Sequence, residues 1–242
     1  MSSRIKSTFG KRSYLSQSQS AYKRYIIAVE GDKTEIDYFK GFNKCRKELG
    51  IRDGVDVLPL ERTDTKSAPK HVYDLLNEFA QKNYPLNQSS QPLIDEDDEL
   101  WMVIDRDRRN NSAEQLKAVL ADCNKANFNL AITNPAFELW LILHFIKFAD
   151  LEQTEVEKLC NNSKVSTKNT FSKAMLKKLE SAERSKFDKG IDSFMLYKDK
   201  IRQAISEAEQ LENNANILIA DDGVSSLGTN IHTLIEKFFR ID

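Results

Sequence analysis

The sequence has 242 residues, of which 40% are hydrophobic and 30% are charged, a composition typical of soluble globular proteins. This length allows one sizeable core, or one core with a substantial insertion. The formal net charge of −1 excludes a protein that is basic throughout, so a surface for nucleic acid would have to come from local clustering of bases.

The cysteines and histidines are few and scattered. The three cysteines and three histidines form no CxxC pair and no closely spaced group, which argues against a disulfide framework and against a zinc site. The first 23 residues lack the apolar segment of a secretory signal, and the longest apolar run, residues 137–148, is too short to cross a bilayer. We therefore expect a soluble, cytoplasmic protein with no membrane association.

Residues 1–24 contain six lysines and arginines and no acidic residue. The simplest interpretation is a flexible basic arm. The alternative is an electrostatic arm that binds phosphates or a partner.

Residues 25–149 alternate between predicted strands and helices. Short apolar runs predict strands at Tyr25–Val29, Val55–Leu58, Leu100–Ile104 and Phe128–Ile132. Apolar spacing predicts helices at 34–48, around 72–79 and around 116–123, and Asn134–Pro135 is expected to open a helix over 136–147. This alternation favours an α/β fold with a mainly parallel sheet flanked by helices. The acidic run at 95–99 is expected to lie in a solvated loop.

Residues 150–212 are polar and contain no clear strand signal, so we expect a helical insertion or subdomain there. A last strand at Asn216–Ala220 and a helix at Ile231–Phe239 are expected to return the chain to the core, which residues 213–242 would complete.

Three acidic residues follow two of the predicted strands: Glu30 follows the first, and Asp105 and Asp107 follow the third. The carboxyl ends of parallel strands share one edge of a sheet, where ligands bind. Carboxylate oxygens are ligands of Mg²⁺, and a glutamate there can also act as a general acid or base in phosphoryl chemistry. The sequence therefore predicts a magnesium site at these three residues. Taken singly, either motif is more often explained by capping or turn formation.

Neighbouring residues have two interpretations each. Asp32 and Glu35 have the spacing of a capping box, or Glu35 supports the metal site. Lys33 is either solvated or close to a phosphate. Glu138 lies in the first turn of an apolar helix, where it either interacts with the helix dipole or adds to the acidic site. His144 is expected to be a core histidine with its hydrogen bonds satisfied.

Residues 164–202 carry eleven lysines and arginines against five acidic residues, while the whole chain is nearly neutral. We predict that this helical stretch contacts phosphates, with Lys173, Lys177 and Lys178 as the leading candidates. A solvated helical face is the alternative.

Three motifs together resemble the RloB-like family. They are YIIAVEGDKTE at 25–35, VIDRD at 103–107, and NPAFELW at 134–140 with His144 after it; GTNIH at 228–232 closes the pattern. That family looks like a branch of the Toprim nucleases, whose hallmarks are a strand-end glutamate followed by glycine and a later Asp-x-Asp.

The resemblance implies a Toprim-like fold, Mg²⁺ with Mn²⁺ as a substitute, and cleavage of phosphodiester bonds in DNA or RNA, including transfer RNA. It also implies a role in bacterial defence against phage, beside an ABC-type ATPase. By the same resemblance Glu30 would be the general acid/base, Asp105 and Asp107 the metal ligands, and Glu35 and Glu138 part of an extended acidic set.

Two alternatives stay open. One is a non-catalytic Toprim-like scaffold within a defence complex. The other is a different Toprim-type phosphotransfer activity, such as strand passage, for which this length leaves little room. The residues do not decide between DNA and RNA, and a homo-oligomer is left open.

Overall fold

The protein is described here by a computed structural model of residues 23–31, 33–61, 68–83, 94, 96–187, 190–220 and 227–239. Most of the basic arm, residues 1–22, therefore lies outside the described residues.

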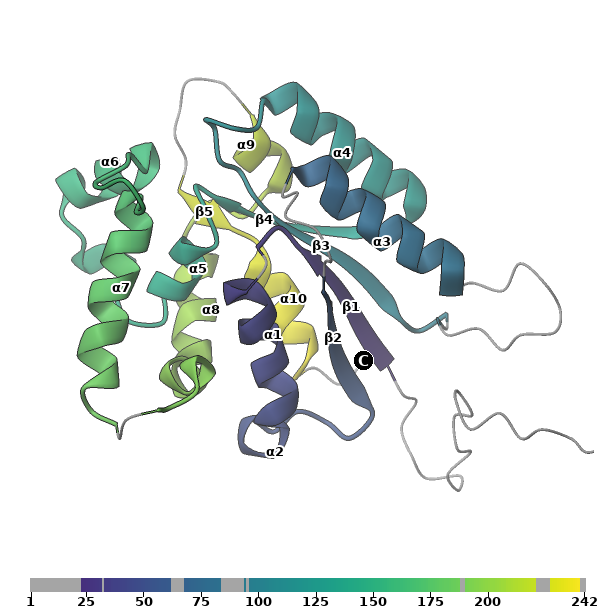
Figure 1. Ribbon diagram of the computed structural model, residues 1–242, viewed down its shortest axis with the longest axis horizontal. Coiled ribbons are helices and arrows are strands. Elements are labelled where there is room, and N and C mark those ends of the chain that lie inside the picture. The colour runs from purple at the N-terminus through teal and green to yellow at the C-terminus, as the bar shows by residue number, and fades with distance from the viewer. Residues whose placement is uncertain are drawn as a thin grey trace, which may run out of the picture.

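A single five-stranded sheet forms the centre of the fold (Figure 1). Its strand order is β2-β1-β3-β4-β5. The strands are β1 (Lys23–Val29), β2 (Val55–Leu60), β3 (Glu99–Asp105), β4 (Asn129–Asn134) and β5 (Gly228–Thr229). The first four strands pair in parallel, and β5 pairs antiparallel with β4. The predicted α/β fold with a mainly parallel, Toprim-like sheet is confirmed.

Both faces of the sheet are buried, as the apolar run of β1 predicted. Tyr25, Ile27 and Val29 belong to one hydrophobic core, while Ile26 and Ala28 belong to the other. Alternate side chains of a strand point to opposite faces, so a strand covered on both sides must be apolar at every position.

Helices cover each face of the sheet (Figure 1). One face carries α3 (Pro69–Asn83), α4 (Ala113–Ala126) and α9 (Ala215–Ile219). The other carries α1 (Thr34–Lys44), α5 (Glu138–Ile142), α8 (Ile201–Glu209) and α10 (Ile231–Lys237), with the short α2 (Arg46–Leu49) after α1. Farther from the sheet lie α6 (Gln153–Asn161) and α7 (Phe171–Arg184). Three 3₁₀ turns, Phe148–Asp150, Ser193–Leu196 and Lys198–Lys200, connect the helices of this part of the chain. Residues 150–212 are thus mainly helical where the structure describes them, as expected.

The strand predicted at 216–220 is wrong, because these residues lie in α9 and the turn after it. A short apolar run does not separate a strand from a buried helix by its pattern alone. Here the side chain of Asn214 accepts a hydrogen bond from the backbone N–H of Asn216 at 2.9 Å and caps the helix. The last strand is β5 instead. Its Gly228 passes so close to the carbonyl oxygen of Glu212 that an added Cβ would lie 1.9 Å from it.

The helix predicted over 136–147 is shorter than expected. Asn134 ends β4, the Asn134–Pro135 peptide bond is cis, and α5 begins only at Glu138. Proline therefore follows a strand rather than opening the helix. After Ile142 the backbone continues in tighter turns, with the N–H of His144 bonded to the carbonyl of Leu141.

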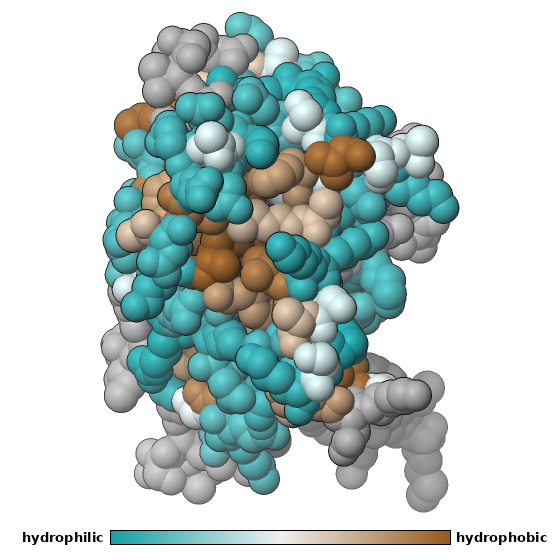
Figure 2. All heavy atoms as spheres, turned by 90° about the vertical axis from the view of Figure 1, so that its left-hand side faces the viewer, coloured by the Kyte–Doolittle hydropathy of each residue, from teal (hydrophilic) through white to brown (hydrophobic). Residues whose placement is uncertain are grey.

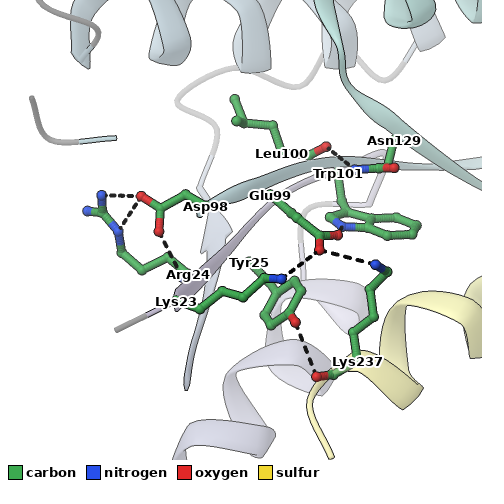
Figure 3. A network of polar contacts seen from close by, with 9 residues as sticks. All are labelled: Lys23, Arg24, Tyr25, Asp98, Glu99, Leu100, Trp101, Asn129 and Lys237. Carbon is green, nitrogen blue, oxygen red and sulfur yellow. Dashed lines mark hydrogen bonds and ion pairs between the residues drawn. The ribbon is translucent and has the colours of Figure 1, made fainter. Parts of the chain in front are cut away.

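The acidic run at 95–99 is not simply solvated, contrary to the prediction. Asp98 is 8% exposed and accepts hydrogen bonds from the backbone N–H and the Nε of Arg24, at 2.9 and 3.1 Å. Glu99 pairs with Lys23 and with Lys237 of α10 (Figure 3). These two acids therefore join the beginnings of β1 and β3 to the C-terminal helix.

Candidate active site

The parallel register brings the predicted acids to one edge of the sheet. Glu30 directly follows β1, and its backbone N–H donates to the carbonyl of Val103 in β3 at 3.1 Å. Its carboxylate accepts a hydrogen bond from the backbone N–H of Asp105 at 3.0 Å. Asp105 ends β3, and its own carboxylate accepts from the N–H of Phe137, which precedes α5, at 2.8 Å. Backbone groups of neighbouring strands thus orient both carboxylates.

Glu35 lies over the end of β1 rather than in a capping box. The N-cap of α1 is Lys33, which makes no side-chain cap, and Asp32 lies outside the described residues. A Cβ added at Gly31 would lie 1.9 Å from the carboxylate of Glu35. The absence of a side chain at Gly31 therefore leaves the space that the Glu35 carboxylate fills.

Four of the predicted acids interact electrostatically. Burial raises the pKa of Asp105 well above its usual value, and the negative charges of Glu30, Glu35 and Glu138 raise it further. The sheet edge therefore concentrates carboxylates whose simultaneous ionisation is unfavourable.

The fifth acid, Asp107, is linked to this group through Glu138. Burial raises the pKa of Glu138, the charge of Lys173 opposes that rise, and the charge of Asp107 adds to it. The carboxylate of Asp107 accepts from Nδ2 of Asn110 at 2.6 Å and from the N–H of Arg109 at 3.3 Å. Its φ of 24° places it at the turn that follows β3.

A cleft of about 400 Å³ opens beside these acids. One part of its wall comes from the end of β3 and the loop after it, the end of β4 and the start of α5. The other comes from residues 160–173, which run from the end of α6 to the start of α7. The charged residues that line it are Asp105, Asp107, Glu138, Arg108, Arg109, Lys164, Lys168 and Lys173. The cleft thus combines carboxylates with cations.

A family model described as RloB-like protein matches residues 25–238. The chain belongs to the RloB-like family. No curated protein and no solved structure matches the chain. Among the helices of the described residues, none combines the length and the apolar character needed to cross a bilayer.

In this RloB-like protein the predicted phosphate-contacting lysines lie in different places. Lys173 lines the acidic cleft. Lys177 donates to the side-chain oxygen of Asn169 at 2.9 Å. Lys33 is exposed and pairs with Asp37 at 3.0 Å.

Lys178 lines a separate hollow of about 280 Å³, together with Ile146, Leu151, Met175 and Leu179. Figure 2 looks onto the side of the molecule that carries α6 and α7, and it shows hydrophobic side chains surrounded by hydrophilic ones. Lys173 and Lys178 thus lie on different sides of α7, and only the side with Lys173 borders the cleft that Asp105, Asp107 and Glu138 line.

Several other bases of the 164–202 stretch pair with carboxylates. Lys186 and Lys200 both pair with Glu183, and Lys198 pairs with Glu48. The basic stretch is therefore divided between ion pairs and the cleft.

The sequence-based prediction did not single out the cleft bases Arg108, Arg109, Lys164 and Lys168. Arg108 and Arg109 directly follow the Asp-x-Asp motif, and that position was a usable signal. The guanidinium of Arg109 donates to the carbonyls of Asn161 and Asn162 at 2.9 and 2.6 Å. It thereby joins the loop after β3 to the end of α6.

His144 is a core histidine, as predicted. Its ring is fully buried, with Nδ1 3.0 Å from the carbonyl oxygen of Trp140 and Nε2 3.1 Å from the hydroxyl of Tyr38. These contacts assign the proton to Nδ1, so that Nε2 accepts from Tyr38. Burial lowers the pKa of His144 to about 3, which keeps the ring neutral.

The chemistry of the strand-end donors fits a hard divalent cation, because Glu30, Asp105 and Asp107 all offer carboxylate oxygens. Within the described ranges, no three acidic, histidine or cysteine side chains are already arranged as ligands around one point. The three carboxylates accept hydrogen bonds from N–H groups instead.

Proposed function

We propose that this RloB-like protein is a magnesium-dependent nuclease that hydrolyses phosphodiester bonds in DNA or RNA. The observation that carries the proposal is the crowding of carboxylates at the sheet edge, where the charges of Glu30, Glu35 and Glu138 all raise the pKa of Asp105. Such a cluster is electrostatically costly by itself and suits a site that binds a cation. The bases in the same cleft suit a phosphodiester.

In the proposed mechanism Asp105 and Asp107 hold Mg²⁺, for which Mn²⁺ can substitute, and Glu30 acts as ligand and general acid/base. When bound, the ion would polarise the phosphoryl group of the substrate and activate a water molecule for attack. The bond from the N–H of Asp105 holds the Glu30 carboxylate at the strand end, where a proton can be exchanged with the reacting oxygens. Glu35 and Glu138 complete the negative field that favours the cation.

The setting in cells is part of the same proposal. Membership of the RloB-like family supports a role in bacterial defence against phage, with an ABC-type ATPase as partner. A site that cleaves nucleic acid is harmful unless controlled, and a partner ATPase could supply that control. Cytoplasmic localisation follows from the same setting.

The first test is cleavage of plasmid DNA and of total transfer RNA by the purified chain, with Mg²⁺, Mn²⁺ or EDTA, alone and with the ATPase. Glu30→Gln, Asp105→Asn and Asp107→Asn should each lower cleavage by about a hundredfold or more, because each removes charge that stabilises the transition state. Asp122→Asn on α4 is the matched control. Its carboxylate is partly exposed on α4 and pairs with Lys70 and Lys125, away from the cleft, so cleavage should not change.

The competing function is a non-catalytic scaffold, which the lack of a ready-made ligand arrangement among the described residues favours. Phage protection in cells separates the two functions. Protection that survives Glu30→Gln and Asp105→Asn would establish the scaffold and refute the nuclease.

A further inference from the structure

Three lysines of the cleft come from one ordered turn and the helix after it. We infer that Lys164, Lys168 and Lys173 form a subsite that binds the phosphate backbone of a polynucleotide next to the phosphodiester that is cleaved. The inference rests on the proposed function and narrows its substrate, from any phosphodiester bond of DNA or RNA to one within a chain that extends beyond the reacting phosphate.

The turn that carries Lys164 and Lys168, residues 163–170, is held by local hydrogen bonds, and Lys173 lies in the first turn of α7. The N–H of Val165 donates to the carbonyl of Asn169 at 2.9 Å, and the N–H of Phe171 donates to the carbonyl of Ser163, also at 2.9 Å. The Ser166 hydroxyl accepts from the N–H of Asn169 at 3.1 Å. The positions of the lysine backbones are therefore fixed before a ligand arrives, which lowers the entropy lost on binding.

The three ammonium groups are available for an anion. In the part of the chain that the structure describes, none of the three makes an ion pair with a carboxylate, in contrast to Lys186, Lys198 and Lys200 on the same stretch. The side chains of all three lysines are exposed, and all three line the cleft. Lys173 interacts electrostatically with Glu138 across the cleft, but among the residues that the structure describes the lysines that line this wall are not bound in ion pairs, so their positive charge is expected to attract a polyanion.

The start of α7 adds to this positive potential. Thr170, the N-cap of this fourteen-residue helix, lines the cleft together with Lys173 in the first turn. The first N–H groups of α7 donate to Ser163, Asn162 and Thr170, so what the helix start adds is the partial positive charge of the helix dipole. Arg109 is not counted in the subsite, because its guanidinium already binds the carbonyls at the end of α6.

The chemistry of the subsite selects phosphates rather than bases. Lysine ammonium groups bind phosphates as point charges and carry no planar recognition pattern. Contacts of this kind fix the position of a nucleic acid without reading its sequence. The described lining of the cleft also contains no aromatic ring on which a base could stack. Binding should therefore depend strongly on salt and weakly on sequence.

The test is the salt dependence of binding, measured in EDTA by fluorescence polarisation with a labelled single strand of about 12 nucleotides, DNA and RNA in turn. Lys168→Gln with Lys173→Gln should reduce the slope of log Kd against log salt by about 1.4, since each phosphate contact contributes about 0.7 for single strands. Adding Lys164→Gln should bring the reduction to about 2. The control pair, Lys147→Gln with Lys178→Gln, removes the same charge at the other hollow and should leave the slope unchanged.

Competition with adenosine monophosphate completes the test. One phosphate cannot occupy both the reacting position and the subsite, so the mononucleotide should compete about tenfold less well than an unlabelled strand, or worse. Three results would each overturn the inference. The slope of log Kd against log salt could be unchanged in the Lys168 and Lys173 variant, or it could fall by the same amount in the control pair. The mononucleotide could also compete as well as the unlabelled strand at the same concentration. The assay contains no free metal, so its outcome is independent of cleavage. A reduced slope together with unaffected cleavage in Glu30→Gln would keep the subsite and refute the nuclease mechanism.

Discussion

Gly31 is the residue that gives Glu35 access to the end of β1. An alanine Cβ there would meet the carboxylate of Glu35 at 1.9 Å, and this carboxylate is the far end of a flexible side chain that can turn away. Gly31→Ala should therefore displace Glu35 from Asp105 without removing any charge. We expect cleavage to fall roughly tenfold to a hundredfold, since small misplacements at a site have effects of this size. Stability should change by less than about 1 kcal/mol.

The same substitution ten residues later is the natural control. A Cβ at Gly41 would lie 2.0 Å from the ring of Phe194, which is buried in the core. Gly41→Ala should destabilise the protein by about 1–3 kcal/mol through overpacking, and at a temperature where the chain stays folded cleavage should be retained. Urea unfolding and cleavage rates measured on both variants distinguish the two positions. If Gly31→Ala cleaved at the rate of the wild type, Glu35 would have no role at the site.

Among the secondary-structure elements, α5 links the site to the core. Glu138 begins the helix at the cleft, and His144 follows its end in the interior. The ring Nδ1 of His144 donates to the carbonyl of Trp140. In a continued α-helix, the backbone N–H of His144 would donate to this same carbonyl. That N–H bonds to Leu141 instead, which accounts for the early end of α5.

The neutral ring of His144 should make stability depend on pH. An unfolded histidine binds a proton below about pH 6.5, while the pKa of His144 in the folded protein is lowered to about 3. Between these values the unfolded chain binds more protons, so stability should fall as the pH falls, by up to about 1.4 kcal/mol per pH unit. Urea unfolding between about pH 7 and about pH 4 measures this slope. His144→Gln should flatten it, and His71→Gln, on the exposed surface of α3, should not.

The elements that the sequence predicted well are those with strong local signals. β1, β3 and β4 are buried on both faces, so each contains a continuous apolar run that ends where the polar site begins. The edge strand β2 is weaker, with Asp56 between its valines. The run at 216–220 misled because it is short and its partners are distant. β5 was not predicted, since its two residues pair with β4 across about a hundred positions of the chain and carry no periodicity.

At the scale of the whole molecule, the cleft is formed by two regions of the chain. The acids could be predicted because each follows a strand or begins a helix, and the parallel sheet gathers those ends. Lys173 was predicted among the bases of the 164–202 stretch, and it lines the cleft. Which of the other bases reach the cleft could not be predicted, because this depends on how residues 160–173 pack beside the loop after β3. That packing includes the bonds from Arg109 to Asn161 and Asn162, which composition and periodicity do not encode.

The central claim, that the strand-end carboxylates bind a divalent cation, is tested most directly by the unfolding midpoint of the full chain in EDTA, Mg²⁺ and Mn²⁺, compared with Asp105→Asn. Either ion should stabilise the wild type, by about 2.7 kcal/mol at a hundredfold excess over Kd. Asp105→Asn keeps the acceptor for the N–H of Phe137 but removes a buried charge whose raised pKa marks it as unfavourable, so its midpoint in EDTA should exceed that of the wild type. Its response to either ion should be largely lost. A wild-type midpoint that is the same in all three conditions, or an Asp105→Asn protein that responds as fully as the wild type, would contradict the account.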